Sequence, residues 1–193
     1  MLWINLGSGQ RTLLGAVNVD KEVAARPDVL WDLEQTPWPF EDNSADQIFC
    51  THVLEHLGRE TVVFFAVMKE IYRILKPEAV CEIRVPHVRC SNFWNDPTHV
   101  RVITPEIIGL FSKENCAEFA KNKWPNTPLA VYLDIDFILL EVVYKLTPNW
   151  SSRWESGQLP QKELDYAANT YWNVIEEITM KIKKIAPTTA EKG

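Results

Sequence analysis

The sequence predicts an α/β fold, with helices packed around a doubly wound sheet whose strands are mostly parallel. Five short apolar runs lie between residues 2 and 87, and a periodic helical segment separates the fourth from the fifth. A long apolar stretch at 131–146 and another helical pattern near the C-terminus follow. Strands that alternate with helices in this way are typical of the doubly wound architecture.

The five apolar runs have the length of buried strands. They span residues 2–6, 16–20, 28–33, 45–53 and 79–87, and turn residues bound them. Short, nearly continuous apolar runs are expected where a parallel sheet is covered on both faces. Periodicity alone also allows short helices, so the assignment depends on their order along the chain.

The helical segments carry clearer signals. In 59–75 the residues Val63, Val67 and Ile71 recur at helical spacing, and Pro77 prevents the helix from continuing. Residues 161–185 show an apolar face with acids early and lysines late, which suits the helix dipole. We therefore predict one long C-terminal helix there.

The remaining segments are assigned from local signals. Thr104, Pro105 and Glu106 form an N-cap, a first-turn proline and a first-turn acid, so a helix is predicted from 104 to about 119. The run 131–146 is too apolar for a loop and is predicted as one long or two short strands. Residues 88–103 and 147–160 are predicted loops.

Length and composition indicate a single globular domain. The chain has 193 residues, a net charge of -6 and 46% hydrophobic residues, so we predict one domain over 1–186 and a disordered tail at 187–193. The acidic balance argues against a general nucleic-acid partner. The four cysteines form no CxxC pair, and no leader or membrane-length apolar run is present. A reduced cytoplasmic protein without a membrane partner is expected.

Chemically useful residues follow each predicted strand. These are Gly7-Ser8-Gly9, Asp20, Asp32-Leu33, Thr51-His52 with Glu55-His56, and His87. Because ligands bind outside the carboxyl ends of parallel strands, these residues are expected at one rim of the sheet. Glycine lets the backbone approach a ligand closely, and an acid after the second strand can accept hydrogen bonds from a ribose diol. The GxG element alone is weak evidence, because a tight turn would use the same residues.

Taken together, these segments resemble the class I S-adenosylmethionine-dependent methyltransferases, in the small-molecule branch with a type 11 domain. The resemblance rests on "INLGSG" with Asp20, on "DVLWDLEQTPWPFEDNSADQIFCTHVLEHL", and on "MKEIYRILKP" with "CEIRVP". It covers about residues 2–87 and implies a Rossmann-like class I methyltransferase sheet with S-adenosylmethionine as cofactor. The cofactor-binding residues that it implies are Gly7, Ser8, Gly9, Asp20, Asp32, Leu33, Thr51 and His52.

Three features depart from the family pattern. Arg11 stands where a third glycine is usual, only residues 10–16 separate Gly9 from the second strand, and "KPEAV" precedes the fifth strand without a glycine pair. A helix of two or more turns does not fit in 10–16 together with its connections. We therefore predict a sheet that lacks a full first helix. A dinucleotide-binding dehydrogenase fits worse, because it needs that helix and a third glycine.

Histidines are the candidate catalytic groups. Methyl transfer to a hydroxyl or an amine requires alignment of the acceptor and removal of a proton, which histidine can accept near neutral pH. His87 ends the fifth strand and His99 lies in the following loop, so these two are the predicted catalytic residues. A hydrogen-bonded structural histidine is an equal alternative for His87. His52 and His56 lie four residues apart, but no third ligand is evident and no metal is predicted.

The sequence thus favours S-adenosylmethionine-dependent methyl transfer to a small-molecule or sugar acceptor. The acceptor class follows only from the family resemblance. One alternative is a catalytically impaired methyltransferase-like module that serves as a binding scaffold, and a weaker one is a nucleotide-sugar enzyme. Because the first helix is missing, another segment or a second subunit could complete the pocket, so a homo-oligomer is also considered.

Overall fold

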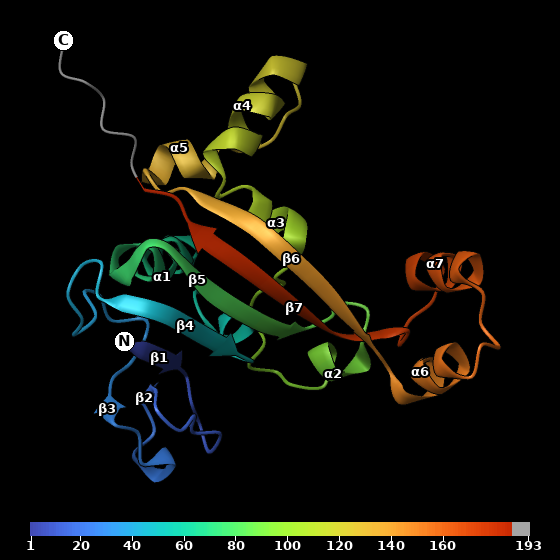
Figure 1. Cartoon of the computed structure of the whole chain (residues 1–193), viewed down its shortest axis with the longest axis horizontal. Coiled ribbons are helices and arrows are strands. Elements are labelled where there is room, and N and C mark those ends of the chain that lie inside the picture. The colour runs from blue at the N-terminus through green and yellow to red at the C-terminus, as the bar shows by residue number, and fades with distance from the viewer. Residues whose placement is uncertain (187–193) are drawn as a thin grey trace.

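Seven strands form one sheet in the computed structural model, which describes residues 1–186 (Figure 1). The predicted tail at 187–193 lies outside the described residues. The spatial order is β3-β2-β1-β4-β5-β7-β6. The strands are β1 (Trp3–Leu6), β2 (Val17–Asp20), β3 (Val29–Leu30), β4 (Ala45–Thr51), β5 (Leu75–Pro86), β6 (Phe137–Leu146) and β7 (Ile175–Lys184). All five predicted N-terminal strands are present.

Strand pairing confirms the mostly parallel α/β sheet. β1 pairs in parallel with both β2 and β4, with Ile4 opposite Val17 and Ile48. β3 continues the parallel part beside β2, and β5 continues it beside β4. β7 is antiparallel to both β5 and β6, so the antiparallel hairpin occupies one edge.

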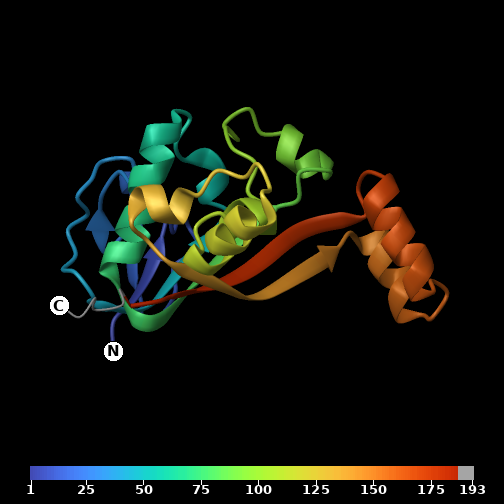
Figure 2. The ribbon, with the colours of Figure 1, turned by 90° about the horizontal axis from the view of Figure 1, so that it is seen from above.

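Helices cover one face of the sheet (Figure 2). α1 (Thr61–Ile74) buries Val67, Met68 and Ile71 completely, and these residues belong to the same core cluster as Ile4 and Ile83. The shorter helices α3 (Pro105–Gly109), α4 (Lys113–Asn122) and α5 (Leu129–Leu133) follow β5 and lie on the same side. The Thr104 side chain caps α3 by accepting a hydrogen bond from the Ile107 amide, as its sequence predicts.

Residues 7–16 contain no helix, which confirms the prediction of a missing first helix. β2 and β3 are joined only by a short 3₁₀ turn, η1 (Val23–Ala25). The side chains of Phe49, Glu82 and Arg84 alternate with core residues along β4 and β5 and are only partly buried. Because no helix packs over them within the described chain, this face of the sheet stays largely uncovered.

The predicted C-terminal helix over 161–185 is wrong in its second half. α7 (Gln161–Thr170) ends at residue 170, and β7 follows as an antiparallel strand. Ile178, Met180 and Ile182 are all buried, which is the two-residue period of a strand. The chain therefore ends in the sheet, where β7 separates β5 from β6 and contributes to the core.

Four other predicted segments need correction. The helix predicted over 104–119 is divided into α3 and α4, and the first part of 131–146 is helical in α5 before β6 begins at Phe137. Both predicted loops contain short helices, namely α2 (Ser91–Trp94) and α6 (Pro148–Glu155), while η2 (Leu54–His56) follows β4. α6 and α7 project beyond the far end of the β6–β7 hairpin (Figure 1).

No helix within residues 1–186 combines the length and apolar character needed to cross a bilayer.

A buried carboxylate attaches the loop after β3 to α1. Glu70 is 7% exposed and accepts hydrogen bonds from the Trp38 amide at 2.6 Å and from Arg73 Nε at 2.7 Å. Arg73 in turn donates to the backbone carbonyls of Trp38 and Phe40. The paired carboxylate raises the pKa of Arg73. This network fixes the loop that precedes β4.

We expect Glu70→Ala to lower the free energy of unfolding by about 3 kcal/mol, because it leaves the buried Trp38 amide and the partly buried Arg73 guanidinium without their hydrogen-bond acceptor. Urea denaturation followed by circular dichroism measures this change. Glu141→Ala is the matched control, since Glu141 pairs with Lys181 at the surface and its loss is expected to have no measurable effect. Equal stability of the two variants would contradict the assigned role of Glu70.

Candidate functional site

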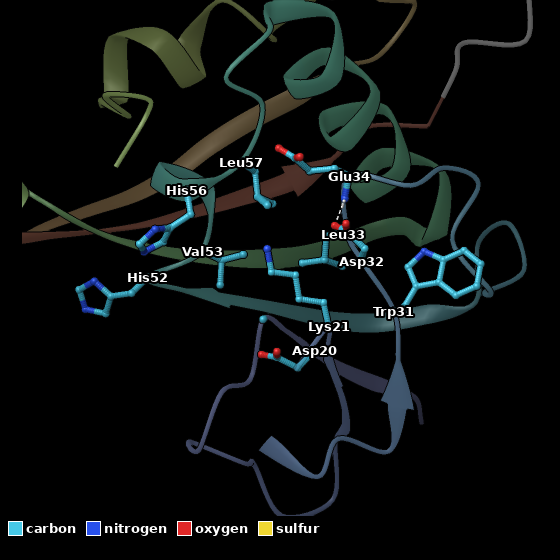
Figure 3. Close-up of a pocket in the computed structure, with 11 residues that line it drawn as sticks. Asp20, Lys21, Trp31, Asp32, Leu33, Glu34, His52, Val53, His56 and Leu57 are labelled. Carbon is cyan, nitrogen blue, oxygen red and sulfur yellow. Dashed lines mark hydrogen bonds between the residues drawn. The ribbon is translucent and has the colours of Figure 1, made fainter. Parts of the chain in front are cut away.

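A cleft of about 220 Å³ opens where strands β1 to β4 end (Figure 3). It lies at the carboxyl ends of parallel strands, the location expected for a ligand site in such a sheet. Its lining residues are Gly7, Asp20, Lys21, Trp31, Asp32, Leu33, Glu34, His52, Val53, His56 and Leu57. Five of the eight predicted cofactor-binding residues are among them: Gly7, Asp20, Asp32, Leu33 and His52.

The glycine loop is held by Asp20 rather than by a following helix. Asp20 Oδ2 accepts a hydrogen bond from the Gly9 amide at 2.7 Å, and Oδ1 accepts one from the Glu22 amide at 2.8 Å. Gly7 has φ +61, and a Cβ there would lie 2.6 Å from a methyl group of Val53. Glycine at position 7 therefore allows both the left-handed turn and the close packing of Val53 beneath the cleft.

The segment after β3 forms the opposite wall of the cleft. Asp32 Oδ1 accepts a hydrogen bond from the Glu34 amide at 3.0 Å, which closes a tight turn. Leu33 is 6% exposed and gives this wall an apolar surface. Trp31 lies at one end of the cleft, and the Lys21 side chain extends from β2 toward its middle (Figure 3).

His52 lies between two carboxylates. Its Nδ1 is 3.3 Å from Glu55 Oε1 and its Nε2 is 2.8 Å from Glu177 Oε2. Hydrogen bonding to Glu55 is the largest influence that raises the pKa of His52, and Glu177 adds to it. Because both ring nitrogens face carboxylates, the protonated form of His52 is favoured at the edge of the cleft.

His56 and His99 form an imidazole pair beside the cleft. His56 lines it, and the centres of the two rings lie 4.6 Å apart in an edge-to-face arrangement. His99 also packs against Phe93, whose ring centre is 5.1 Å away. The structure therefore brings predicted catalytic residue His99 to the cleft through His56, a contact that sequence spacing alone does not reveal.

The other predicted site residues lie elsewhere. Ser8 and Thr51 border an adjoining hollow of about 340 Å³, which shares Gly7 with the cleft and includes Phe49 and Arg84 of the uncovered sheet face. Gly9 does not line the cleft, although its amide is bound to Asp20.

His87, the other predicted catalytic residue, lies outside the cleft lining. Its Nδ1 accepts a hydrogen bond from the Arg89 amide at 3.2 Å. Burial, with a smaller contribution from the charge of Arg89, lowers the pKa of His87. A neutral His87 ring with Nδ1 occupied carries its hydrogen on Nε2, which fits the structural alternative better than a general base.

Comparisons with known proteins agree with this geometry. Residues 14–83 match the family model of a methyltransferase domain, whereas a comparison with curated protein sequences found no match. The matched segment runs from the connection before β2 into β5 and includes Asp20, Asp32 and the residues after β4.

Structural alignments to solved proteins of the methyltransferase fold cover nearly the whole chain. One is a SAM-dependent methyltransferase from Archaeoglobus fulgidus, 18% identical with a TM-score of 0.58, over 95% of this chain and 86% of that one. Another is the 1,6-didemethyltoxoflavin-N1-methyltransferase of Burkholderia thailandensis with bound 1,6-didemethyltoxoflavin and S-adenosylhomocysteine, 11% identical with a TM-score of 0.53, over 96% and 71%. A third is the cyclase SpnF, 13% identical with a TM-score of 0.53, over 96% and 76%. At these identities the structures establish the shared fold.

The family match covers the central cleft-forming segment, and the sheet order continues the same fold to residue 186. Asp20 and Asp32, which follow β2 and β3, both line this cleft. Residues 14–83 are therefore similar to a methyltransferase domain, and the described chain shares the fold of the solved methyltransferase structures.

Proposed function

We propose that the cleft binds S-adenosylmethionine and that the chain transfers its methyl group to a small-molecule or sugar acceptor. The observation that carries this proposal is the convergence of Gly7, Asp20 and Asp32 on one cleft with an apolar wall at Leu33. Asp20 is suited to the ribose hydroxyls, because each carboxylate oxygen keeps acceptor capacity beyond its backbone bond. Leu33 offers apolar contact to the adenine.

The charges of the cleft suit a cofactor without phosphate. Asp20, Asp32 and Glu34 line it, whereas Lys21 is its only ammonium group among the described residues. No helix N-terminus lies behind the glycine loop, so the usual favourable site for a pyrophosphate is missing. A volume of 220 Å³ is below the roughly 300–1,000 Å³ of most small-molecule sites, so part of the cofactor is expected to remain exposed.

An aromatic row leads away from the cleft toward a possible acceptor surface. Ring centres are 4.6 Å apart for His56 and His99, 5.1 Å for His99 and Phe93, and 5.2 Å for Phe93 and Trp94. Trp94 is 60% exposed and lies 6.5 Å from the ring of Trp172. Exposed aromatic faces beside a polar cleft favour a small organic acceptor.

When bound, S-adenosylmethionine supplies an electrophilic methyl group on a positively charged sulfur. The chain must then align the acceptor, exclude water and receive a proton where the acceptor is a hydroxyl or an amine. Both ring nitrogens of His52 face carboxylates, and this favours its protonated form over one that accepts a proton. Of the two predicted catalytic residues, we favour His99, because it reaches the cleft through His56.

The alternative function is a methyltransferase-like scaffold that binds the cofactor weakly or not at all. The small cleft and the uncovered sheet face favour this alternative. Measuring cofactor binding distinguishes the methyltransferase from the scaffold. Nucleotide controls test the weaker hypothesis of a nucleotide-sugar enzyme. We also retain two predictions from the sequence, namely a possible homo-oligomer and a cytoplasmic location.

We expect isothermal titration calorimetry to show binding of S-adenosylmethionine and S-adenosylhomocysteine, and none of NAD or ATP. Asp20→Ala is expected to lower the affinity for both ligands at least tenfold, which corresponds to about 1.4 kcal/mol of binding free energy. The substitution removes the acceptor for the ribose hydroxyls and the partner of the Gly9 amide. The melting temperature of the variant controls for folding. Absence of wild-type binding at millimolar ligand would support the scaffold instead.

Two glycine variants separate backbone strain from the role of the cleft. Gly7 and Gly157 both have positive φ, but only at Gly7 would a Cβ collide with another side chain. We expect Gly157→Ala to cost about 1 kcal/mol of unfolding free energy and Gly7→Ala about 2–3 kcal/mol. Chemical denaturation and calorimetry measure both effects. Only Gly7→Ala should reduce cofactor affinity, and an equal reduction in both variants would place the cofactor elsewhere.

A further inference from the structure

Three potential metal ligands meet beside the cleft. Glu55, His56 and His99 each offer one donor atom, and these atoms lie within 4.8 Å of one another. Glu55 and His56 belong to η2, whereas His99 comes from the loop that follows α2. The loop is attached there because the amides of Val100 and Arg101 both donate to the Glu55 carbonyl oxygen.

Hydrogen bonds on the far side of each ring leave the Nε2 lone pairs free. The Thr98 hydroxyl donates to Asp96 Oδ1 at 2.6 Å, so it must accept the hydrogen from His56 Nδ1 at 2.9 Å. His99 Nδ1 donates to the Phe93 carbonyl at 2.6 Å. Metal-binding histidines typically donate their second ring N–H to such an acceptor, which fixes the tautomer and the ring orientation. Both rings of the cluster are therefore arranged as ligands.

Glu55 supplies a second and independent observation. Its side chain is fully buried, and Oε1 is 3.3 Å from His52 Nδ1. Oε2 is buried without a hydrogen-bond partner, and the ion-pair partner of this carboxylate within residues 1–186 is His52, which contacts Oε1. Burying an uncompensated acceptor is costly. A cation at Oε2 would remove that cost.

We propose that Glu55, His56 and His99 bind a divalent transition metal ion, with Zn²⁺ as the first candidate. Two imidazole nitrogens and one carboxylate are the ligand set of an open zinc site, which keeps a fourth position for another oxygen. Asp96 Oδ2 lies 3.9 Å from His99 Nε2 and is an oxygen that could take the fourth position. Bond lengths of about 2.1 Å place ligand atoms roughly 3.4 Å apart, so donor atoms that lie up to 4.8 Å apart must approach by at most about 1.4 Å on binding.

The position of this site suggests its use. His56 belongs both to the cluster and to the lining of the cleft. A metal ion there would attract an acceptor oxygen and lower its pKa. This role would replace proton acceptance by His99, because the remaining lone pair of that ring would bind the metal. This use rests on the proposed methyl transfer, whereas metal binding itself does not.

Metal binding can be measured on the tag-free full chain after removal of metals with a chelator. We expect calorimetry to show one Zn²⁺ bound per chain, and Co²⁺ to give the visible absorption of a four-coordinate site. His56→Asn, His99→Asn and Glu55→Gln should each weaken binding by about 10- to 100-fold or more, because each removes one ligand. No S-adenosylmethionine is present, so the result is independent of cofactor binding.

His87→Asn is the matched control, since it removes a histidine that lies outside the cluster. It should leave Zn²⁺ affinity within about twofold, and far-UV circular dichroism of all variants without metal reports whether they fold. Co²⁺ absorption separates ligand loss from unfolding, because a folded variant that lacks one ligand changes the spectrum. The proposal is overturned if the wild type binds no stoichiometric metal, or if His87→Asn loses as much affinity as the cluster variants.

Discussion

The connection between β1 and β2 is too short for a helix, and much of the structure follows from this constraint. Parallel strands are usually joined by a dozen or more residues, but only residues 7–16 are available here. The chain crosses as a loop that two buried asparagines hold. Asn5 Nδ2 donates to Asn18 Oδ1 at 2.9 Å and to the Arg11 carbonyl at 3.0 Å, while the Leu13 amide donates to Asn18 Oδ1 at 2.8 Å. Side-chain hydrogen bonds thus replace the apolar packing of a crossover helix.

The same constraint changes the electrostatics of the cleft. A helix after the glycine loop would place a partial positive charge at its N-terminus. Here the carboxylate of Asp20 binds the loop amide instead, so the local charge is negative. Such a site disfavours a pyrophosphate and tolerates a sulfonium cation. The missing helix also leaves one sheet face uncovered, and Ser8 and Thr51 therefore border an open hollow on that face.

Sequence patterns predicted those elements whose own residues carry a clear strand, helix-cap or turn signal. The strands up to β5, the Thr104 cap and the cleft acids follow from short runs and from the residues after them. The prediction of a C-terminal helix failed because Ile178 and Ile182, four residues apart, fit a helical period as well as the two-residue period of a strand. The deciding strand positions are Met180 and Lys184, and the latter is buried because its ammonium donates to Asn43 Oδ1 and to the Leu75 carbonyl. Strand alternation also explains Thr51, which faces the side opposite Cys50. The meeting of His56 with His99 depends on a loop whose path no local pattern specifies.

Glu55 connects the N-terminal and C-terminal halves of the chain beside the candidate site. Its carbonyl oxygen receives the Val100 and Arg101 amides, and its carboxylate reaches His52, which also contacts Glu177 of β7. The segment after residue 83, beyond the family match, is thereby fastened to the cleft at one buried acid. Packing alone would favour an apolar residue here, because a buried carboxylate with one unpaired oxygen opposes folding. A carboxylate at this position is therefore better explained by the chemistry of the site than by stability.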